Sequence, residues 1–166
     1  MDFMVDQVFA ASGDAVARAY ADPALYDHLS GLPKLDTPEV LDHRVDGTTV
    51  RLAIRYRFIG ELATAVTAVV DPRKLSWVEH SVHDLVTRSI RYKLAPDHYA
   101  DRLQSAGTCA ITDRDNGGSV RTVKGSLKVK ALIVGGAVER AIVSGLREHL
   151  AGEVALVERY ASSSSP

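Results

Sequence analysis

The side chains that could carry out chemistry are few and scattered. The chain has six histidines and one cysteine. His80 and His83 are three residues apart, and in an extended strand they face opposite sides, so they are not expected to bind one metal ion together. No His-Glu-x-x-His, Gly-x-Ser-x-Gly or Gly-x-Gly-x-x-Gly pattern occurs. The sequence therefore predicts no metal site, no cofactor and no known catalytic set.

Two polar residues share strand faces with apolar ones. His80 alternates with Val78 and Val82, and a histidine there could act as a general base near neutral pH. Arg88 alternates with Ile90 and could bind a ligand carboxylate through two hydrogen bonds. The ordinary alternatives are a histidine that is hydrogen-bonded within the wall, and a strand-end arginine that reaches solvent or pairs with a core acid. We favour the ordinary alternative at both positions.

The remaining candidates point to structural roles. A lone cysteine, Cys109, excludes an intramolecular disulfide, and it is expected to be buried and unreactive. Arg51, Arg55 and Arg57 form a stripe that could attract anionic lipid or RNA. Because no aromatic side chains interleave with the stripe on that face, a solvated outer face is the favoured interpretation.

Composition is that of a globular domain. The chain has 166 residues, 46% of them hydrophobic, and a net charge of −1, so no global field attracts nucleic acid. Neither a secretory signal nor a segment of about 20 apolar residues is present. We expect one domain over 1–161, a disordered tail over 162–166, a cytoplasmic location, no integral membrane association, and a monomer or weak homodimer.

Hydrophobic patterning predicts the elements that must position these side chains. Residues 2–9 read as a strand with Phe3, Val5 and Phe9 on one face. Ser12 is a plausible N-cap for a first short helix, and a second short helix is expected over 24–29. Strands follow at 40–45 and 48–59, joined by an Asp46-Gly47 signal for a type I′ hairpin.

Further strands are expected at 75–82, 85–94, 103–112 and 120–129, with His83-Asp84 as the turn between the first two. Residues 61–70 are ambiguous, and we favour a helix or irregular lid. A long helix over 137–160 carries one apolar stripe. The stripe consists of Val134, Val138, Ile142, Leu146, Leu150, Val154 and Val157.

This order resembles the START-like or helix-grip (SRPBCC) superfamily, which includes polyketide cyclases and lipid-transfer domains. Within it, the segment 129–140 (VKALIVGGAVER), Asp22-Pro23 and 46–48 are similar to a bacterial domain family of unknown function. The resemblance implies an α+β domain in which about six to seven antiparallel strands curve around the C-terminal helix. It supplies no catalytic residues, and residues 95–102 look like an insertion relative to that family.

The superfamily implies a cavity between the concave sheet face and the long helix, although the same side chains could instead pack a solid core. Strand and helix parity give the following ligand-binding candidates. They are Ile54, Tyr56, Phe58, Arg88, Ile90, Tyr92, Val138, Ile142 and Leu146.

Three functions remain open. The leading hypothesis is non-catalytic binding or transport of a small apolar or amphipathic molecule, such as a lipid. The second is a cyclase or aromatase type of enzyme, with acid–base help from His80, Arg88, Tyr56 or Tyr92. The third is a protein-interaction module that uses a strand edge or the segment 61–70.

Overall fold

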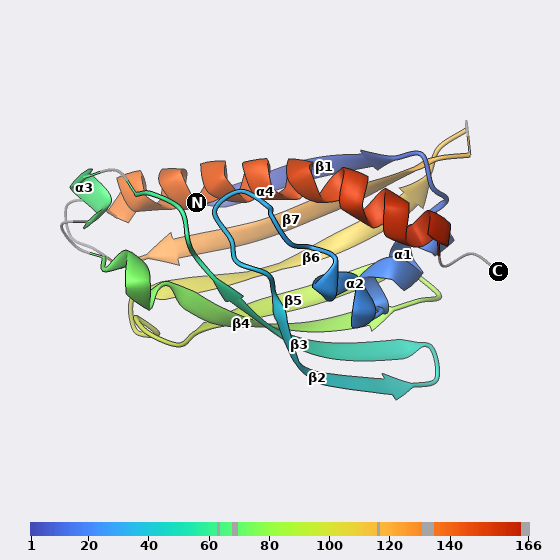
Figure 1. Cartoon of the computed structure of the whole chain (residues 1–166), viewed down its shortest axis with the longest axis horizontal. Helices are drawn as coiled ribbons and strands as arrows, with labels where there is room; N and C mark the ends of the chain where they lie inside the picture. The colour runs from blue at the N-terminus through green and yellow to red at the C-terminus, as the bar shows by residue number, and fades with distance from the viewer. Residues whose placement is uncertain (63, 68–69, 116, 131–134, 164–166) are drawn as a thin grey trace.

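A curved antiparallel sheet wraps around one long helix (Figure 1). The computed structural model describes residues 1–62, 64–67, 70–115, 117–130 and 135–163. The sheet has seven strands in the order β1-β7-β6-β5-β4-β3-β2, and α4 (Gly135–Ser163) lies across its concave face. The predicted α+β helix-grip architecture is therefore confirmed.

The predicted element order is also found. The strands are β1 (Asp2–Phe9), β2 (Glu39–Asp46), β3 (Thr49–Arg57), β4 (Ser76–Asp84), β5 (Ser89–Pro96), β6 (Leu103–Asp113) and β7 (Ser119–Val129). The short helices are α1 (Gly13–Ala21), α2 (Ala24–Asp27), α3 (Thr64–Thr67) and the 3-10 turn Pro72–Lys74.

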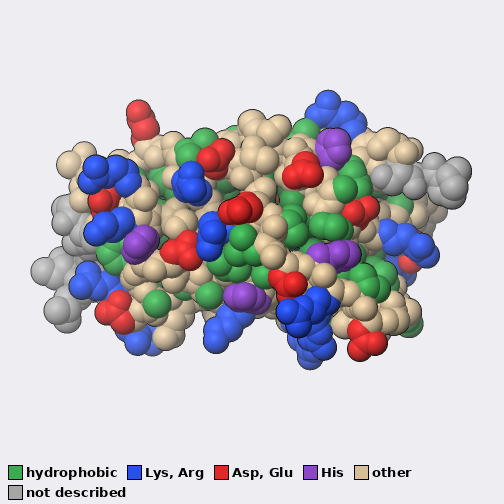
Figure 2. Space-filling view, turned by 60° about the horizontal axis from the view of Figure 1, so that its bottom comes forward, with side chains coloured by type: hydrophobic (Ala, Val, Ile, Leu, Met, Phe, Trp, Pro, Cys, Tyr) green, Lys and Arg blue, Asp and Glu red, His purple; other side chains and the backbone are tan. Residues whose placement is uncertain are grey.

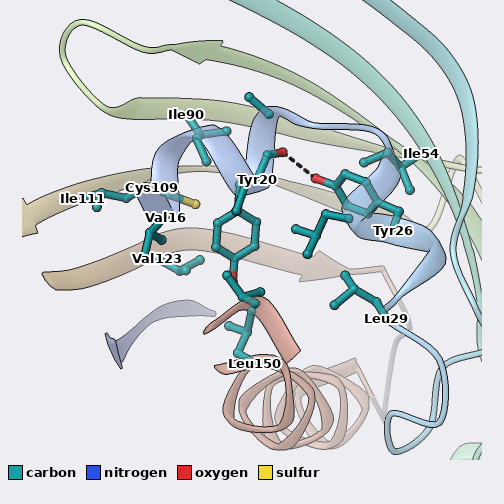
Figure 3. Packing of buried hydrophobic residues seen from close by; sticks show 14 of the residues in the cluster. Val16, Tyr20, Tyr26, Leu29, Ile54, Ile90, Cys109, Ile111, Val123 and Leu150 are labelled. Atoms are coloured by element: carbon teal, nitrogen blue, oxygen red, sulfur yellow. Dashed lines mark hydrogen bonds between the residues drawn. The ribbon is translucent and has the colours of Figure 1, made fainter. Parts of the chain in front are cut away.

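The N-terminal unit follows its sequence signals. Phe3, Gln7 and Phe9 are buried on one face of β1. The Ser12 side chain accepts a hydrogen bond from the Ala15 amide at 3.3 Å, which confirms it as the N-cap of α1. Helix α1 then inserts Tyr20 between the sheet and α4 (Figure 3).

Two turns differ from the prediction. The β2–β3 turn has Gly47 and Thr48 at its centre, and of these only Gly47 has a positive φ, 57°. This excludes a type I′ turn, which needs positive φ at both central positions. The β4–β5 turn spans residues 85–88 and not His83-Asp84, because the Asp84 side chain accepts bonds from the amides of Val86 and Thr87.

The inward face of β4 is also opposite to the prediction. Trp77, Glu79, Ser81 and His83 face the concave side, whereas His80 is exposed on the convex side. Apolar alternation favoured Val78 and Val82 as the inner residues, but the concave face here carries polar side chains. His80 is therefore neither a cavity base nor the hydrogen-bonded wall histidine that was favoured, because its side chain is exposed.

The long helix extends further than expected in both directions. Its 29 residues give a length of about 43 Å at 1.5 Å per residue. It includes Ser162 and Ser163, which were expected in the tail, while residues 164–166 and the predicted stripe residue 134 lie outside the described residues. Its buried side includes His149 and Glu153 as well as apolar residues.

The two uncertain segments are partly described. Within 61–70, a short helix, α3, is present, and residues 63, 68 and 69 lie outside the described residues. Within the suspected insertion 95–102, β5 continues to Pro96 and a turn leads to β6. None of the described helices combines the length and apolar character needed to cross a bilayer.

Candidate functional site: a cavity between the sheet and the long helix

A cavity of about 110 Å³ lies between the concave sheet face and α4. Its wall is formed mainly by aromatic and aliphatic side chains, with a few ionisable groups among them. The lining residues are Phe3, Tyr20, Tyr26, Leu35, Tyr56, Trp77, Glu79, His83, Ile90, Tyr92, Leu94, Ser105, Cys109, Arg121, Val123, Leu146, His149, Leu150 and Glu153.

Four of the predicted ligand-binding residues line this cavity. They are Tyr56, Ile90, Tyr92 and Leu146. Ile54 is buried on the same face of β3 without lining the cavity, and Phe58, Val138 and Ile142 also lie outside the lining.

Arg88 lies away from the cavity because the β4–β5 turn comes later than predicted. The residue has a φ of 53° at the end of that turn. Its Nη1 donates to Asp113 Oδ2 at 2.6 Å and lies 3.6 Å from Asp14 Oδ1. Arg88 is therefore a strand-end arginine, as the ordinary alternative expected, but the acids that it pairs with are exposed and do not belong to the core.

Two glycines make room for the aromatic wall. Tyr92, Gly107, Gly125 and Phe3 are successive cross-strand partners over β5, β6, β7 and β1. A Cβ on Gly107 would lie 2.5 Å from Tyr92 Oη, and one on Gly125 would lie 2.5 Å from Phe3 Cζ. The missing side chains therefore set where the two rings can lie.

Five buried polar residues form a paired cluster beside the cavity: Gln7, Tyr20, Arg121, His149 and Glu153. Arg121 Nη1 donates to Gln7 Oε1 at 2.5 Å, and Gln7 Nε2 donates to the Leu150 carbonyl at 2.6 Å. The Arg121 guanidinium also lies over the Tyr20 ring, 4.0 Å from its centroid. These contacts join β1, β7, α1 and α4.

Glu153 is the acid of the paired cluster. Its Oε2 accepts from Tyr20 Oη at 3.0 Å and lies 3.9 Å from Arg121 Nη1, while Oε1 lies 2.9 Å from His149 Nε2. Burial alone would raise the pKa of Glu153, but the His149 and Tyr20 hydrogen bonds and the Arg121 charge hold that pKa below its ordinary value. Glu153 is thus a carboxylate, and His149 donates through Nε2.

The packing of this region is visible in Figure 3, where Tyr20 lies between Val123 on the sheet and Leu150 on α4. The Tyr26 hydroxyl donates to the Tyr20 carbonyl at 2.9 Å. Cys109 is buried beside them, and Arg121 Nη2 donates to its Sγ at 3.4 Å. Burial raises the pKa of the Cys109 thiol, so the expected inert cysteine is consistent with its position.

Glu79 differs from Glu153, the acid of the paired cluster. It is half-buried on β4, lines the cavity, and pairs in register with the apolar residues Ile54 and Leu94. Among the described residues, no donor forms a hydrogen bond or ion pair with its carboxylate. Burial, reinforced by the Glu153 charge and opposed by Arg121 and His149, raises the pKa of Glu79 to about 7.

His83 is the second polar group on this strand. It is 3% exposed, its Nε2 lies 2.9 Å from Ser81 Oγ, and its Nδ1 is buried without a partner. Burial and the Arg121 charge lower the pKa of His83 to about 4, so the ring is neutral. Within the described ranges, no three His, Cys, Asp or Glu side chains cluster as a metal site would require.

Sequence analysis missed the polar wall of the cavity. Signals were available for some of it: Gln7 shares strand parity with Phe3 and Phe9, and Arg121 shares parity with Val123. His149 and Glu153 are four residues apart on one helix face. Glu79 was missed because the face of β4 was inverted.

A family model described as "Protein of unknown function (DUF2505)" matches residues 4–160. The chain belongs to this family. The match covers most of both the sheet and α4, so it confirms the suspected resemblance. A search of curated proteins gave no match.

Solved structures share the fold at low identity. TTHA0849 from Thermus thermophilus has a TM-score of 0.70 at 15% identity, with 100% of both chains covered. The ZhuI aromatase/cyclase from Streptomyces sp. R1128 has a TM-score of 0.69 at 14% identity, covering 98% of this chain and 93% of that one. Norcoclaurine synthase from Thalictrum flavum has a TM-score of 0.61 at 17% identity, covering 93% and 86%. These likenesses establish the fold.

Proposed function

We propose that this DUF2505 protein binds a small, mainly apolar molecule in the cavity without transforming it. The observation that carries the proposal is the cavity of about 110 Å³, walled mainly by aromatic and aliphatic side chains. An apolar cavity of about 150 Å³ in another protein takes up benzene. A single aromatic ring is therefore close to the size of guest that this space accepts.

The distribution of charge on one face of the molecule is consistent with a function that resides in the cavity. On the face in Figure 2, basic and acidic side chains are interspersed and do not gather into a patch of one sign. Such a surface offers no field that would concentrate a polyanion. The third hypothesis, a protein-interaction module, is supported by edge strands such as β2, which exposes Leu41 and Val45 among the described residues.

The test uses a neutral ring-sized probe, benzyl alcohol, and a variant that fills the cavity. Ser105 is buried and lines the cavity, so Ser105→Leu should occupy the space and weaken binding at least about tenfold. The control is Ser126→Leu, which places the same side chain at an exposed position of β7. Binding is measured by ligand-observed NMR titration. If wild type shows no binding, or if Ser105→Leu binds as wild type does, the proposal is wrong.

A second candidate is an enzyme of the cyclase type. It is favoured by Glu79, whose pKa of about 7 suits proton transfer near neutral pH, beside the phenols of Tyr56 and Tyr92 in the same cavity. Incubation with a reactive polyketone thioester should then give a cyclised product in wild type and much less in Glu79→Gln. Product formation equal to that in buffer alone would remove this candidate.

A further inference from the structure

We infer, building on the proposed binding function, that the guest carries a protonated amine, which the Glu79 carboxylate accepts inside the aromatic cavity. The first support is the missing partner of Glu79. Its cross-strand neighbours Ile54 and Leu94 are apolar, and no described donor reaches its carboxylate. Glu79 is half-buried at the cavity wall, and a donor on a ligand would supply the hydrogen bonds that the described residues do not.

The second support is the balance of charge around the cavity. Arg121 and Glu153 are opposite charges within one hydrogen-bonded cluster, and Arg121 is further engaged by Gln7 and the Tyr20 ring. The remaining donor of Arg121, Nε, is buried and has no hydrogen-bond partner, but the charge of Arg121 is balanced by Glu153. Among the described residues that line the cavity, Glu79 is the charged group without an oppositely charged side chain in contact, which favours a cationic guest over an anionic one.

The third support is the nature of the wall. The Tyr56 and Trp77 rings stack with centroids 5.9 Å apart, and Tyr26 and Tyr92 also line the cavity. The faces of such rings attract ammonium groups, and the attraction strengthens where water is excluded. A carboxylate among aromatic rings is a combination that recognises an organic ammonium ion, with the rings also holding its apolar part.

The affinity should depend on pH through Glu79. The charged and titratable groups that face it come from six elements. They are Arg121 on β7, His149 and Glu153 on α4, Tyr26 on α2, Tyr56 on β3, Tyr92 on β5 and Cys109 on β6. The pKa of Glu79 in the protein without a guest is about 7. The carboxylate form therefore dominates above that pH and is lost below it. Amine affinity should therefore fall as the pH drops from 8 to 6.

Three ring-sized probes of similar shape test this inference: benzylamine, benzyl alcohol and benzoate. At pH 8, wild type should bind benzylamine at least about tenfold more tightly than benzyl alcohol, as expected for a charge-assisted hydrogen bond, and benzoate most weakly. Glu79→Gln, which keeps the side-chain shape, should abolish the amine preference and retain benzyl alcohol binding. Glu61→Gln removes an exposed acid and should behave as wild type.

The outcomes separate the two proposals. Equal affinity for amine and alcohol in wild type, or an amine preference that survives in Glu79→Gln, overturns the amine inference and leaves cavity binding intact. Absence of binding by all three probes overturns both. Circular dichroism of each variant shows whether it is folded, and the wild-type amine preference at pH 6 and pH 8 gives a readout without any substitution.

Discussion

Glu153 and Glu79 are two carboxyl groups that line one cavity, and their surroundings are opposite. Glu153 receives hydrogen bonds from Tyr20 and His149 and lies near Arg121, and its pKa is lowered. Glu79 has apolar cross-strand neighbours and no described donor, and its pKa is raised to about 7. The same residue type thus stabilises the fold in one region and stays available for a guest in the other.

The contrast follows from position on the sheet. Arg121 pairs in register with Gln7 on β1, close to the side of the domain where α1 and α4 pack together. Glu79 lies on β4, paired with β3 and β5, and faces the cavity. Both regions border the cavity, but helices α1 and α4 supply hydrogen-bond partners to Glu153, whereas no described residue supplies one to Glu79.

The largest expected effect comes from breaking the paired cluster. Arg121→Met leaves the Glu153 carboxylate buried without its cation and should lower the free energy of unfolding by about 3–5 kcal/mol. Urea denaturation at pH 7 measures this effect. Arg91→Met, at an exposed position of β5, is the control and should change stability by less than about 0.5 kcal/mol. A loss of less than about 1 kcal/mol in Arg121→Met would contradict the role given to the cluster.

The next effect concerns Glu153, the acid of the paired cluster. At pH 8, Glu153→Gln should destabilise by about 2 kcal/mol, because it removes a carboxylate that accepts charge-assisted hydrogen bonds. Its pKa is lowered on folding, so that stabilisation is present above the unfolded pKa and is lost as the pH falls. Urea denaturation of the variant and wild type at pH 8 and at pH 4 measures the difference, and a loss that does not shrink at the lower pH would contradict this account.

Glu79→Gln should have the opposite sign. The pKa of Glu79 rises on folding to about 7, so ionisation costs stability as the pH rises from about 4.5 to 7. The variant should be more stable than wild type by about 1–2 kcal/mol at pH 8, after allowance for partial exposure, and equal to it below about pH 4.5. Melting temperatures across this range test it. Destabilisation at pH 8 would show that Glu79 has a partner within the protein.

The smallest effect compares two buried tyrosines. Tyr20 donates to Glu153, so Tyr20→Phe should cost about 1–1.5 kcal/mol. Tyr56 has stacking contacts but no hydrogen bond from its hydroxyl among the described residues, so Tyr56→Phe should change stability by less than about 0.5 kcal/mol. Thermal unfolding of both variants measures the two losses. If the two variants lose the same stability, the Tyr20 hydrogen bond to Glu153 does not stabilise the fold as expected.

The sequence predicted the scaffold well because its signals are local and apolar. Phe3 and Phe9 identified the inner face of β1, and Ser12 identified the start of α1. The alternation of Leu52, Ile54 and Tyr56 on β3 likewise marked the side that is buried. Each of these strands obeys the rule that the face towards the core is the more hydrophobic one.

The candidate site was harder to predict because it breaks that rule. On β4 the inner residues include Glu79, Ser81 and His83, while Val78 lies on the outer face. Polarity alternation therefore pointed the wrong way, and the misplaced turn at His83-Asp84 extended the error to Arg88. Pairing between Arg121 and Glu153 depends on contact between β7 and α4, which no short stretch of sequence encodes.

The glycines that face each other on β6 and β7 affect the volume of the cavity, although neither carries a polar side chain. A methyl group on Gly125 would meet the Tyr92 and Phe3 rings and would lift a ring off the strands, whereas one on Gly107 would lie against the Lys124 carbonyl oxygen and would displace the backbone. Both rings line the cavity, so an alanine at position 125 would reduce the cavity volume from the side of the sheet. A Gly125→Ala variant should therefore admit a smaller molecule than the natural chain does, with the Glu79 carboxylate unchanged in the cavity wall.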